Sequence, residues 1–259
     1  MIDLSMVTST RTDESVTLRD ISTRLGAKEA VLRDCLYAVL VRAVTDGTEH
    51  KSTHDKLSNP DLQLPTLSVL DIGCGRGELM QHLNAAGHTC VGVDVEPDCV
   101  ELARQFGDTH LGGFDSLASL PLPESLDVVV SSHVLEHVDE PLTCLRQALA
   151  LGAERYVFAV PNVLRSIRLV RAVTGSPRAD HPTHVFGWTR PEFNALLERA
   201  GYEVIAWHQD RVTINPLSGK IGTQITRLLS PLETRLLPKL FPMLSSSLIV
   251  ECRPGKGRQ

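Results

Sequence analysis

An apolar run that ends directly in three alternating glycines limits the possible folds of this chain most. Residues 69–77 read VLDIGCGRG, and residues 78–86 follow with helical spacing. Glycines allow a tight turn and let a ligand approach the backbone without Cβ atoms in the way. The start of the following helix offers unpaired N–H groups to a polar ligand. The segment therefore predicts a buried strand, a ligand-binding loop and a helix.

An acidic residue, Asp94, follows at a position where a strand–loop–helix unit of this kind can bind a ligand. The next apolar run, 89–95, ends at Asp94, 17 residues after Gly77. An acid at the tip of this strand can accept hydrogen bonds from both hydroxyls of a ribose. The glycine pattern alone is weak evidence for a binding site. Together with the strand before it, the helix after it and the acid at the end of the next strand, it indicates a nucleoside-containing ligand. The alternative is a domain in which the glycines only form a turn.

Strands and helices alternate along the rest of the chain. We expect strands over 66–72, 89–95, 110–112, 126–132, 156–160, 204–207 and 247–251, and helices over 78–86, 98–106, 141–151 and 190–200. This alternation predicts an α/β fold, a doubly wound seven-stranded Rossmann-like sheet. Residues 15–44 predict an N-terminal helical extension broken at Gly26. We divide the chain into a helical cap and linker (1–60) and a ligand-binding domain (61–259) with a lid-like insertion near 211–245.

Net charge, cysteine spacing and segment composition limit the binding partners and the location that we expect. The net charge of −5 argues against a dedicated DNA-binding protein, although residues 17–40 look like a helix-turn-helix. We expect this segment to cover the active site or to form a homodimer surface. The six cysteines form no C-x-x-C pair, and the N-terminus has no apolar signal region, which predicts a cytoplasmic location. Residues 216–245 mix leucines with basic residues and predict a substrate lid or an inter-subunit helix, with membrane-surface contact as the alternative.

A second polar group follows the fourth expected strand. The segment SSHVLEHV spans residues 131–138, and a helical turn there would place His133, Glu136 and His137 on one face. His181 and His184 come later, just before the helix that begins near Arg190. Both segments follow strands whose carboxyl ends meet at one edge of the sheet. The grouping suits either a divalent metal or a general base.

The spacing D-x-G-x-G-x-G resembles motif I of class I S-adenosylmethionine (SAM)-dependent methyltransferases, and the resemblance extends over about Leu67 to Cys252. It implies SAM as cofactor, with Asp71 and the glycine loop on the methionine part and Asp94 on the ribose. It also implies Asp115 on the adenine amine and Phe114 on the adenine face. The implied cofactor-binding set is Asp71, Gly73, Cys74, Gly75, Gly77, Asp94, Val95, Phe114, Asp115, Ser132 and His133.

A narrower resemblance concerns the histidines. The segments LEHV (135–138) and HVFGWTRPEF (184–193), with Pro161-Asn162 between them, resemble catalytic segments of RNA 3′-terminal 2′-O-methyltransferases. Ubiquinone-pathway O-methyltransferases share the first segment and a downstream histidine. The RNA group binds metal through two glutamates and two histidines, which implies His133, Glu136, His137 and His184 here. His133 departs from that pattern, because the RNA group has an acid there, and this weakens the preference for Mg²⁺.

We therefore expect methyl transfer from SAM to a hydroxyl of a small metabolite or sugar. Either a divalent metal held by His133, Glu136, His137 and His184 activates the hydroxyl, or, without metal, the same cluster contains the proton acceptor, with His137 as the first choice. One alternative is metal-dependent 2′-O-methylation of an RNA 3′ end. Another is a SAM-binding regulatory protein that lacks catalysis. The sequence does not name the acceptor.

Overall fold

The computed structural model describes residues 27–46, 65–173, 175, 183–214 and 219–255. Seven strands form one sheet in the order β3-β2-β1-β4-β5-β7-β6, in which only β7 runs antiparallel to its neighbours. The strands are β1 (Ser68–Ile72), β2 (Thr89–Asp94), β3 (Thr109–Leu111), β4 (Val128–Ser132), β5 (Arg155–Pro161), β6 (Tyr202–His208) and β7 (Ser247–Pro254). The predicted seven-stranded doubly wound sheet is confirmed, with strand ends shifted by one to three residues.

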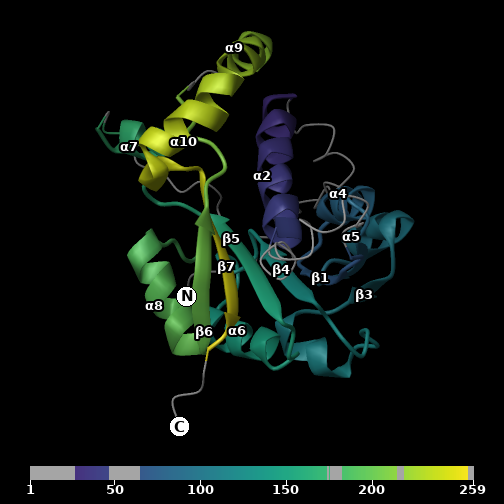
Figure 1. Cartoon of the computed structure of the whole chain (residues 1–259). Helices are drawn as coiled ribbons and strands as arrows, with labels where there is room; N and C mark the ends of the chain where they lie inside the picture. The colour runs from purple at the N-terminus through teal and green to yellow at the C-terminus, as the bar shows by residue number, and fades with distance from the viewer. Residues whose placement is uncertain (1–26, 47–64, 174, 176–182, 215–218, 256–259) are drawn as a thin grey trace, which may run out of the picture.

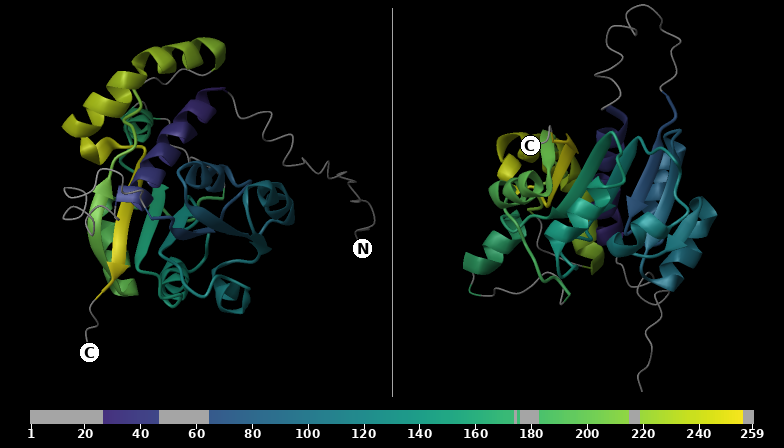
Figure 2. Two further views of the ribbon diagram at one scale, coloured as in Figure 1. Left: turned by 45° about the vertical axis from the view of Figure 1, so that its right-hand side comes forward. Right: turned by 90° about the horizontal axis from the view of Figure 1, so that it is seen from below.

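Helices cover both faces of the sheet (Figures 1 and 2). They are α2 (Ala27–Asp46), α4 (Glu78–Ala85), α5 (Pro97–Ala103), α6 (Pro141–Leu149), α7 (Ser166–Val173), α8 (Arg190–Ala200), α9 (Gly219–Pro231) and α10 (Leu237–Leu240). Shorter turns of helix are η1 (Arg104–Phe106), η2 (Phe114–Ser119), η3 (Leu232–Leu236) and η4 (Pro242–Leu244). The expected helix over 98–106 is thus split between α5 and η1.

Alternate residues of the central strands feed two separate hydrophobic cores. Leu70 and Val129 face the core under η2, α6 and α8, whereas Val69, Val128 and Val130 face the core under α2 and α4. Successive side chains of a strand point to opposite faces, so a sheet covered on both sides needs apolar residues at every position. This explains the unbroken apolar runs in the sequence.

The helix α2 belongs to the second core. Leu40, Ala43 and Val44 are fully buried against the sheet. The Arg155 guanidinium donates to the carbonyl of Ala43 and pairs with Glu251 at 3.0 Å, which ties the end of α2 to β5 and β7. The second half of the expected helical extension is therefore built into the domain. The expected first helix and the linker lie outside the described residues.

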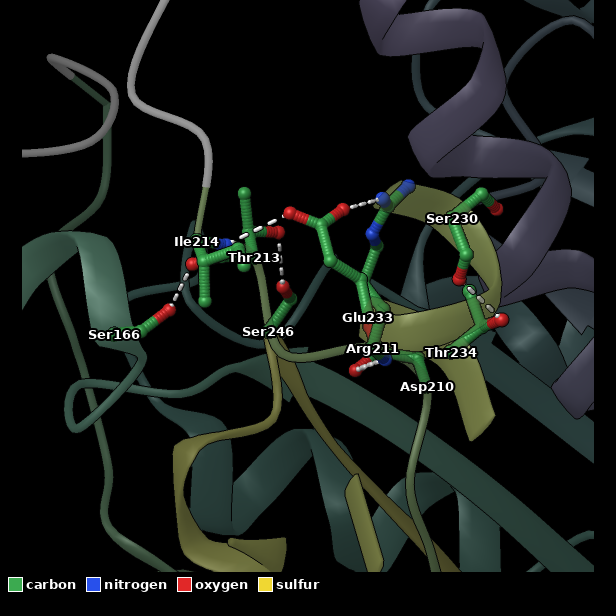
Figure 3. A network of polar contacts seen from close by, with 9 residues as sticks. All are labelled: Ser166, Asp210, Arg211, Thr213, Ile214, Ser230, Glu233, Thr234 and Ser246. Atoms are coloured by element: carbon green, nitrogen blue, oxygen red, sulfur yellow. Dashed lines mark hydrogen bonds and ion pairs between the residues drawn. The ribbon is translucent and has the colours of Figure 1, made fainter. Parts of the chain in front are cut away.

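The segment from α9 to η4 stands beyond the end of the sheet at which β5 and β6 finish (Figure 1). A fully buried ion pair between Arg211 and Glu233 joins it to the loop after β6 (Figure 3). Glu233 also accepts a hydrogen bond from the Ile214 N–H at 2.8 Å. Among the described residues, no helix is long and apolar enough to cross a membrane.

The glycine loop generates the first prediction. Gly73 has φ +78°, and a Cβ atom there would overlap the Val134 side chain. Gly152 has φ +72° with open space around it. Both Gly→Ala variants carry the left-handed cost of roughly 1–2 kcal/mol, but Gly73→Ala adds the clash. We expect Gly73→Ala to lower the free energy of unfolding clearly more than Gly152→Ala in urea denaturation. Equal losses would contradict the close packing of Val134 on the loop.

Candidate functional site

The glycine loop lies between the carboxyl ends of β1 and β4, where the strand order reverses. Open α/β sheets bind their ligands in the crevice at such a switch point. Gly73, Gly75 and Gly77 all have positive φ. The N–H groups of Gly73 and Cys74 donate to the Val93 carbonyl at 2.7 and 3.1 Å, which holds the loop against β2. The predicted turn is therefore formed and is anchored to β2 by backbone hydrogen bonds.

Asp94 closes the loop from the tip of β2. Its Oδ2 accepts a hydrogen bond from the Gly75 N–H at 2.8 Å, and its Oδ1 accepts one from the Glu96 N–H at 2.9 Å. Each carboxylate oxygen has a further lone pair, so these contacts leave acceptor capacity for the two hydroxyls of a ribose. The acid is thus held in place by the same loop that it would assist in ligand binding.

Asp71 lies at the inner end of the crevice and is 2% exposed. Burial, reinforced by the charges of Asp94 and Glu78, raises the pKa of Asp71 from 3.8 to about 7. A cation placed beside this carboxylate would relieve both effects. The site therefore favours a positively charged group at its deepest point.

A cavity of about 380 Å³ opens between the glycine loop and α2. Arg33, Leu36 and Tyr37 of α2 line one side of it. Asp71, Ser132 and His133 are among the residues on the other side. The sequence did not single out the α2 residues, because they stand about 40 positions before the glycine loop and carry no motif.

The remaining residues that we expected to bind the cofactor differ in their exposure. Val95 is 65% exposed at the end of β2, and Asp115 is exposed on η2. The Phe114 ring is 6% exposed and packs in the core with Leu117, so most of its surface contacts the protein. Cys74 is likewise buried, with its sulfur directed toward Gly92 of β2. Val95 and Asp115 thus remain accessible, Cys74 lines the cavity although it is 5% exposed, and the Phe114 side chain packs in the core.

The segment after β4 centres on Glu136, whose side chain is fully buried. Among the described residues, neither of its carboxylate oxygens has a hydrogen-bond partner. Three imidazole nitrogens surround Oε1: His133 Nδ1 at 3.4 Å, His137 Nε2 at 3.9 Å and His184 Nε2 at 4.0 Å. A buried carboxylate without hydrogen bonds is costly, so this arrangement indicates a site that binds a cation or a proton donor.

Backbone contacts bring His184 to this group from the loop before α8. The N–H groups of Val185 and Phe186 donate to the Glu136 carbonyl at 2.9 and 3.3 Å. The rings of His137 and His184 lie edge to face, with centroids 4.7 Å apart. His181 falls outside the described residues. A capping box begins α8, in which the Thr189 N–H donates to the Glu192 carboxylate at 2.9 Å.

The structure separates His133 from the other three residues. Glu136, His137 and His184 each offer one ligand atom, and these atoms all lie within 4.8 Å of one another. His133 contacts Glu136 but is not part of this group. The segment is a tight turn, closed by the His137 N–H on the Val134 carbonyl, in place of the helical turn that we expected. The described geometry thus brings together three of the four expected metal ligands.

Comparison with known proteins identifies the fold's relatives. Residues 40–206 match the family described as a methyltransferase domain. The chain belongs to the class I SAM-dependent methyltransferases. A ubiquinone biosynthesis O-methyltransferase from Methylobacterium nodulans is 30% identical over 172 residues, which cover 61% of this chain and 68% of that protein. One from Xanthomonas campestris is 33% identical over 95 residues, but this covers only 34% of this chain and 39% of that protein.

Solved structures agree on the fold. Magnesium protoporphyrin IX methyltransferase from Synechocystis PCC 6803 with bound SAM gives a TM-score of 0.51 at 13% identity and covers 98% of this chain and 100% of that one. A small RNA methyltransferase gives 0.53 at 18% identity, over 83% of this chain and 25% of that one. At this level of identity the likeness concerns the fold alone. The methyltransferase uses SAM as its cofactor.

The buried Asp71 generates a pH-dependent prediction. Its folded pKa of about 7 exceeds the usual 3.8. The folded protein therefore holds a proton that the unfolded chain releases, and this contribution to stability is lost as pH rises through that window. Asp71→Asn should be more stable than the natural protein above about pH 7, by an amount on the order of a few kcal/mol that shrinks toward about pH 4.

Urea denaturation of the two proteins without SAM, at several pH values, measures this difference. Asp98→Asn, an exposed acid in the first turn of α5, serves as the matched control. A difference between Asp71→Asn and the natural protein that does not change with pH would contradict the assigned cause.

Proposed function

We propose that this methyltransferase transfers the SAM methyl group to a hydroxyl of a small acceptor molecule. The observation that carries the proposal is the buried Glu136 carboxylate with three imidazoles around one of its oxygens, beside the cavity that His133 lines. Similarity to ubiquinone biosynthesis O-methyltransferases supports oxygen as the acceptor atom. An alcohol is a poor nucleophile, so a group that withdraws or accepts its proton is useful here.

The cofactor occupies the crevice from Asp71 to Asp94 in this proposal. Asp71 would pair with the ammonium group of the methionine part, and Arg33 of α2 would pair with its carboxylate, since both residues line the cavity. Asp94 would accept hydrogen bonds from the ribose hydroxyls, and Val95 would contact the adenine. Ser132 and His133 line the same cavity at the end of β4, where the methyl group would be transferred.

The donor set of Glu136, His137 and His184 fits a divalent metal. Two imidazoles and one carboxylate suit Zn²⁺, Fe²⁺, Co²⁺ or Ni²⁺ better than Mg²⁺. Both Glu136 oxygens are buried and have no hydrogen-bond partner among the described residues, and this observation favours a cation there. When bound, such an ion would lower the pKa of the acceptor hydroxyl.

The protein's own residues position the reaction. The acceptor oxygen forms a bond to the methyl carbon while the carbon–sulfur bond breaks, and the electron pair neutralises the sulfonium. Without a metal, the hydroxyl proton leaves toward His137, whose Nδ1 lies 2.8 Å from the Thr183 hydroxyl and whose side chain is 35% exposed. This route carries the proton from the buried cluster toward solvent. With a metal bound, the lone pair of His137 would be used for coordination, so His137 would not also accept the proton.

The first test concerns the cofactor. Asp94→Ala removes a charged acceptor, and each charged hydrogen bond is worth about 1.5–3 kcal/mol. We expect the affinity for S-adenosylhomocysteine, measured by calorimetry, to fall at least tenfold. Asp98→Ala removes an acid of the same charge from the first turn of α5 and should bind normally. Unchanged affinity in the Asp94 variant would exclude the ribose contact.

The second test concerns the cluster and the acceptor. Methyl transfer from SAM is assayed on phenols, sugars and RNA 3′ ends, before and after chelation. We expect a phenol or sugar to be methylated, chelation to abolish activity, and Zn²⁺, Fe²⁺, Co²⁺ or Ni²⁺ to restore it better than Mg²⁺. His184→Ala should be inactive, while His82→Ala, an exposed histidine on α4, should remain active.

The outcomes separate the alternatives. Activity that survives chelation but is lost in His137→Ala would overturn the metal and keep the general base. Methylation of RNA ends alone would replace the small acceptor. SAM binding without turnover of any acceptor would favour a regulatory protein.

A further inference from the structure

His133 adopts a backbone conformation that side chains rarely take. Its φ is +58°, and among the described residues it is the only non-glycine residue with a positive φ. Such a conformation is unfavourable for a residue with a side chain and persists where the surroundings impose it. The N–H of His133 donates to the Ala159 carbonyl of β5 at 2.8 Å, which fixes the turn directly after β4.

Both ring nitrogens of His133 are in contact with the protein. Nδ1 lies 3.4 Å from Glu136 Oε1, and Nε2 lies 3.2 Å from the Ser247 hydroxyl. The imidazole thus stands between the buried carboxylate and the first residue of β7. Because His133 also lines the cofactor cavity, its orientation bears directly on the reaction site.

Ser247 is itself held by a second buried acid. The side chains of Ser247 and Asp210 belong to residues that are 3% and 5% exposed. The Ser247 N–H donates to Asp210 Oδ1 at 3.2 Å, and the Arg211 N–H donates to the same oxygen at 2.6 Å. The carboxylate of Asp210 therefore fixes the start of β7, from which the hydroxyl reaches His133.

The loop that carries Asp210 is braced from the other side. Arg211 forms its buried ion pair with Glu233 (Figure 3). The Val212 N–H donates to the Glu233 carbonyl at 2.9 Å. The Ser246 N–H donates to the Arg211 carbonyl at 2.8 Å. Loop and strand are thus fastened to each other on both sides of Asp210, which makes its position well defined.

We propose that Asp210 and Ser247 are positioning residues of this methyltransferase, which hold the His133 ring with Nδ1 directed at Glu136 and thereby orient the Glu136 carboxylate. Neither oxygen of Glu136 has a hydrogen-bond partner among the described residues, so His133 is placed to restrain it. Partners behind the groups that act directly commonly set their orientation. This inference rests on the proposed role of Glu136 in methyl transfer.

Two neighbouring serines give a matched test. Ser247→Ala removes the hydroxyl that contacts His133, whereas Ser246→Ala removes a hydroxyl that lies 3.3 Å from the Thr213 hydroxyl. We expect Ser247→Ala to lower kcat by roughly 10–100-fold, with unchanged melting temperature and affinity for S-adenosylhomocysteine. Ser247→Thr keeps the hydroxyl and should recover most of the activity. Ser246→Ala should behave like the natural protein.

A spectroscopic measurement makes the test independent of the acceptor. Histidine ring ¹⁵N signals are recorded for the full chain bound to S-adenosylhomocysteine, with the His133 signals assigned through a His133→Gln variant. We expect both ring signals of His133 to shift in Ser247→Ala and to stay in place in Ser246→Ala. Asp210→Asn should shift them in the same direction, because the start of β7 loses its charged acceptor.

The results distinguish this inference from the proposed function. Unchanged His133 signals in Ser247→Ala, or equal losses of kcat in both alanine variants, would overturn the positioning role. If no acceptor is methylated by the natural protein, the proposed function fails, and the ring signals still decide whether Ser247 and Asp210 hold His133.

Discussion

The parallel pairing of β1 with β4 is the constraint on which the site depends. It aligns Asp71 with Val130, so that the glycine loop and the His133 turn leave the sheet side by side. The chain then continues to opposite sides, toward β2 from one loop and toward β5 from the other. No side chain has to fill the crevice between them, because neither connection crosses it. Cofactor and acceptor chemistry consequently meet at one edge of the sheet.

This edge holds several acids that the fold would be more stable without. Asp71, Glu136 and Asp210 are each at most 5% exposed. Burial raises the pKa of both Asp71 and Asp210. Groups of this kind oppose folding, and the two cores on either side of the sheet must offset them. Their concentration at the carboxyl edge is the physical reason for proposing that the functional site lies there.

The sequence predicts those parts of the structure that depend on local patterns. The glycine loop, Asp94 and the alternation of strands and helices each follow from spacing along the chain, and all are found where expected. Strand ends were less certain, because ladder pairing extends past the apolar run at both ends, as for 156–160 against β5, which also includes Arg155 and Pro161. The expected helical turn at His133 was wrong because the turn is imposed by Ala159 of β5.

Contacts between residues far apart in the sequence leave no local pattern from which they could be predicted. The family resemblance implies Phe114 on the adenine face, but most of its ring packs in the core under η2. Ser247 and Asp210 stand 114 and 77 positions from His133 and belong to no motif, so only the β5–β7 and β6–β7 pairings bring them there. Arg33 and Tyr37 are brought to the cavity only by the packing of α2 on the sheet.

The two parts of helix α2 contact different regions of the protein. Its later residues, Leu40 to Val44, are part of the core, and its earlier residues, Arg33 to Tyr37, form a wall of the cofactor cavity. A wall that is continuous with the core cannot swing away as a rigid lid without exposing apolar surface. If SAM binds in this cavity as proposed, exchange of spent cofactor would have to leave α2 packed on the sheet, so the same helix would contribute both to cofactor binding and to folding stability.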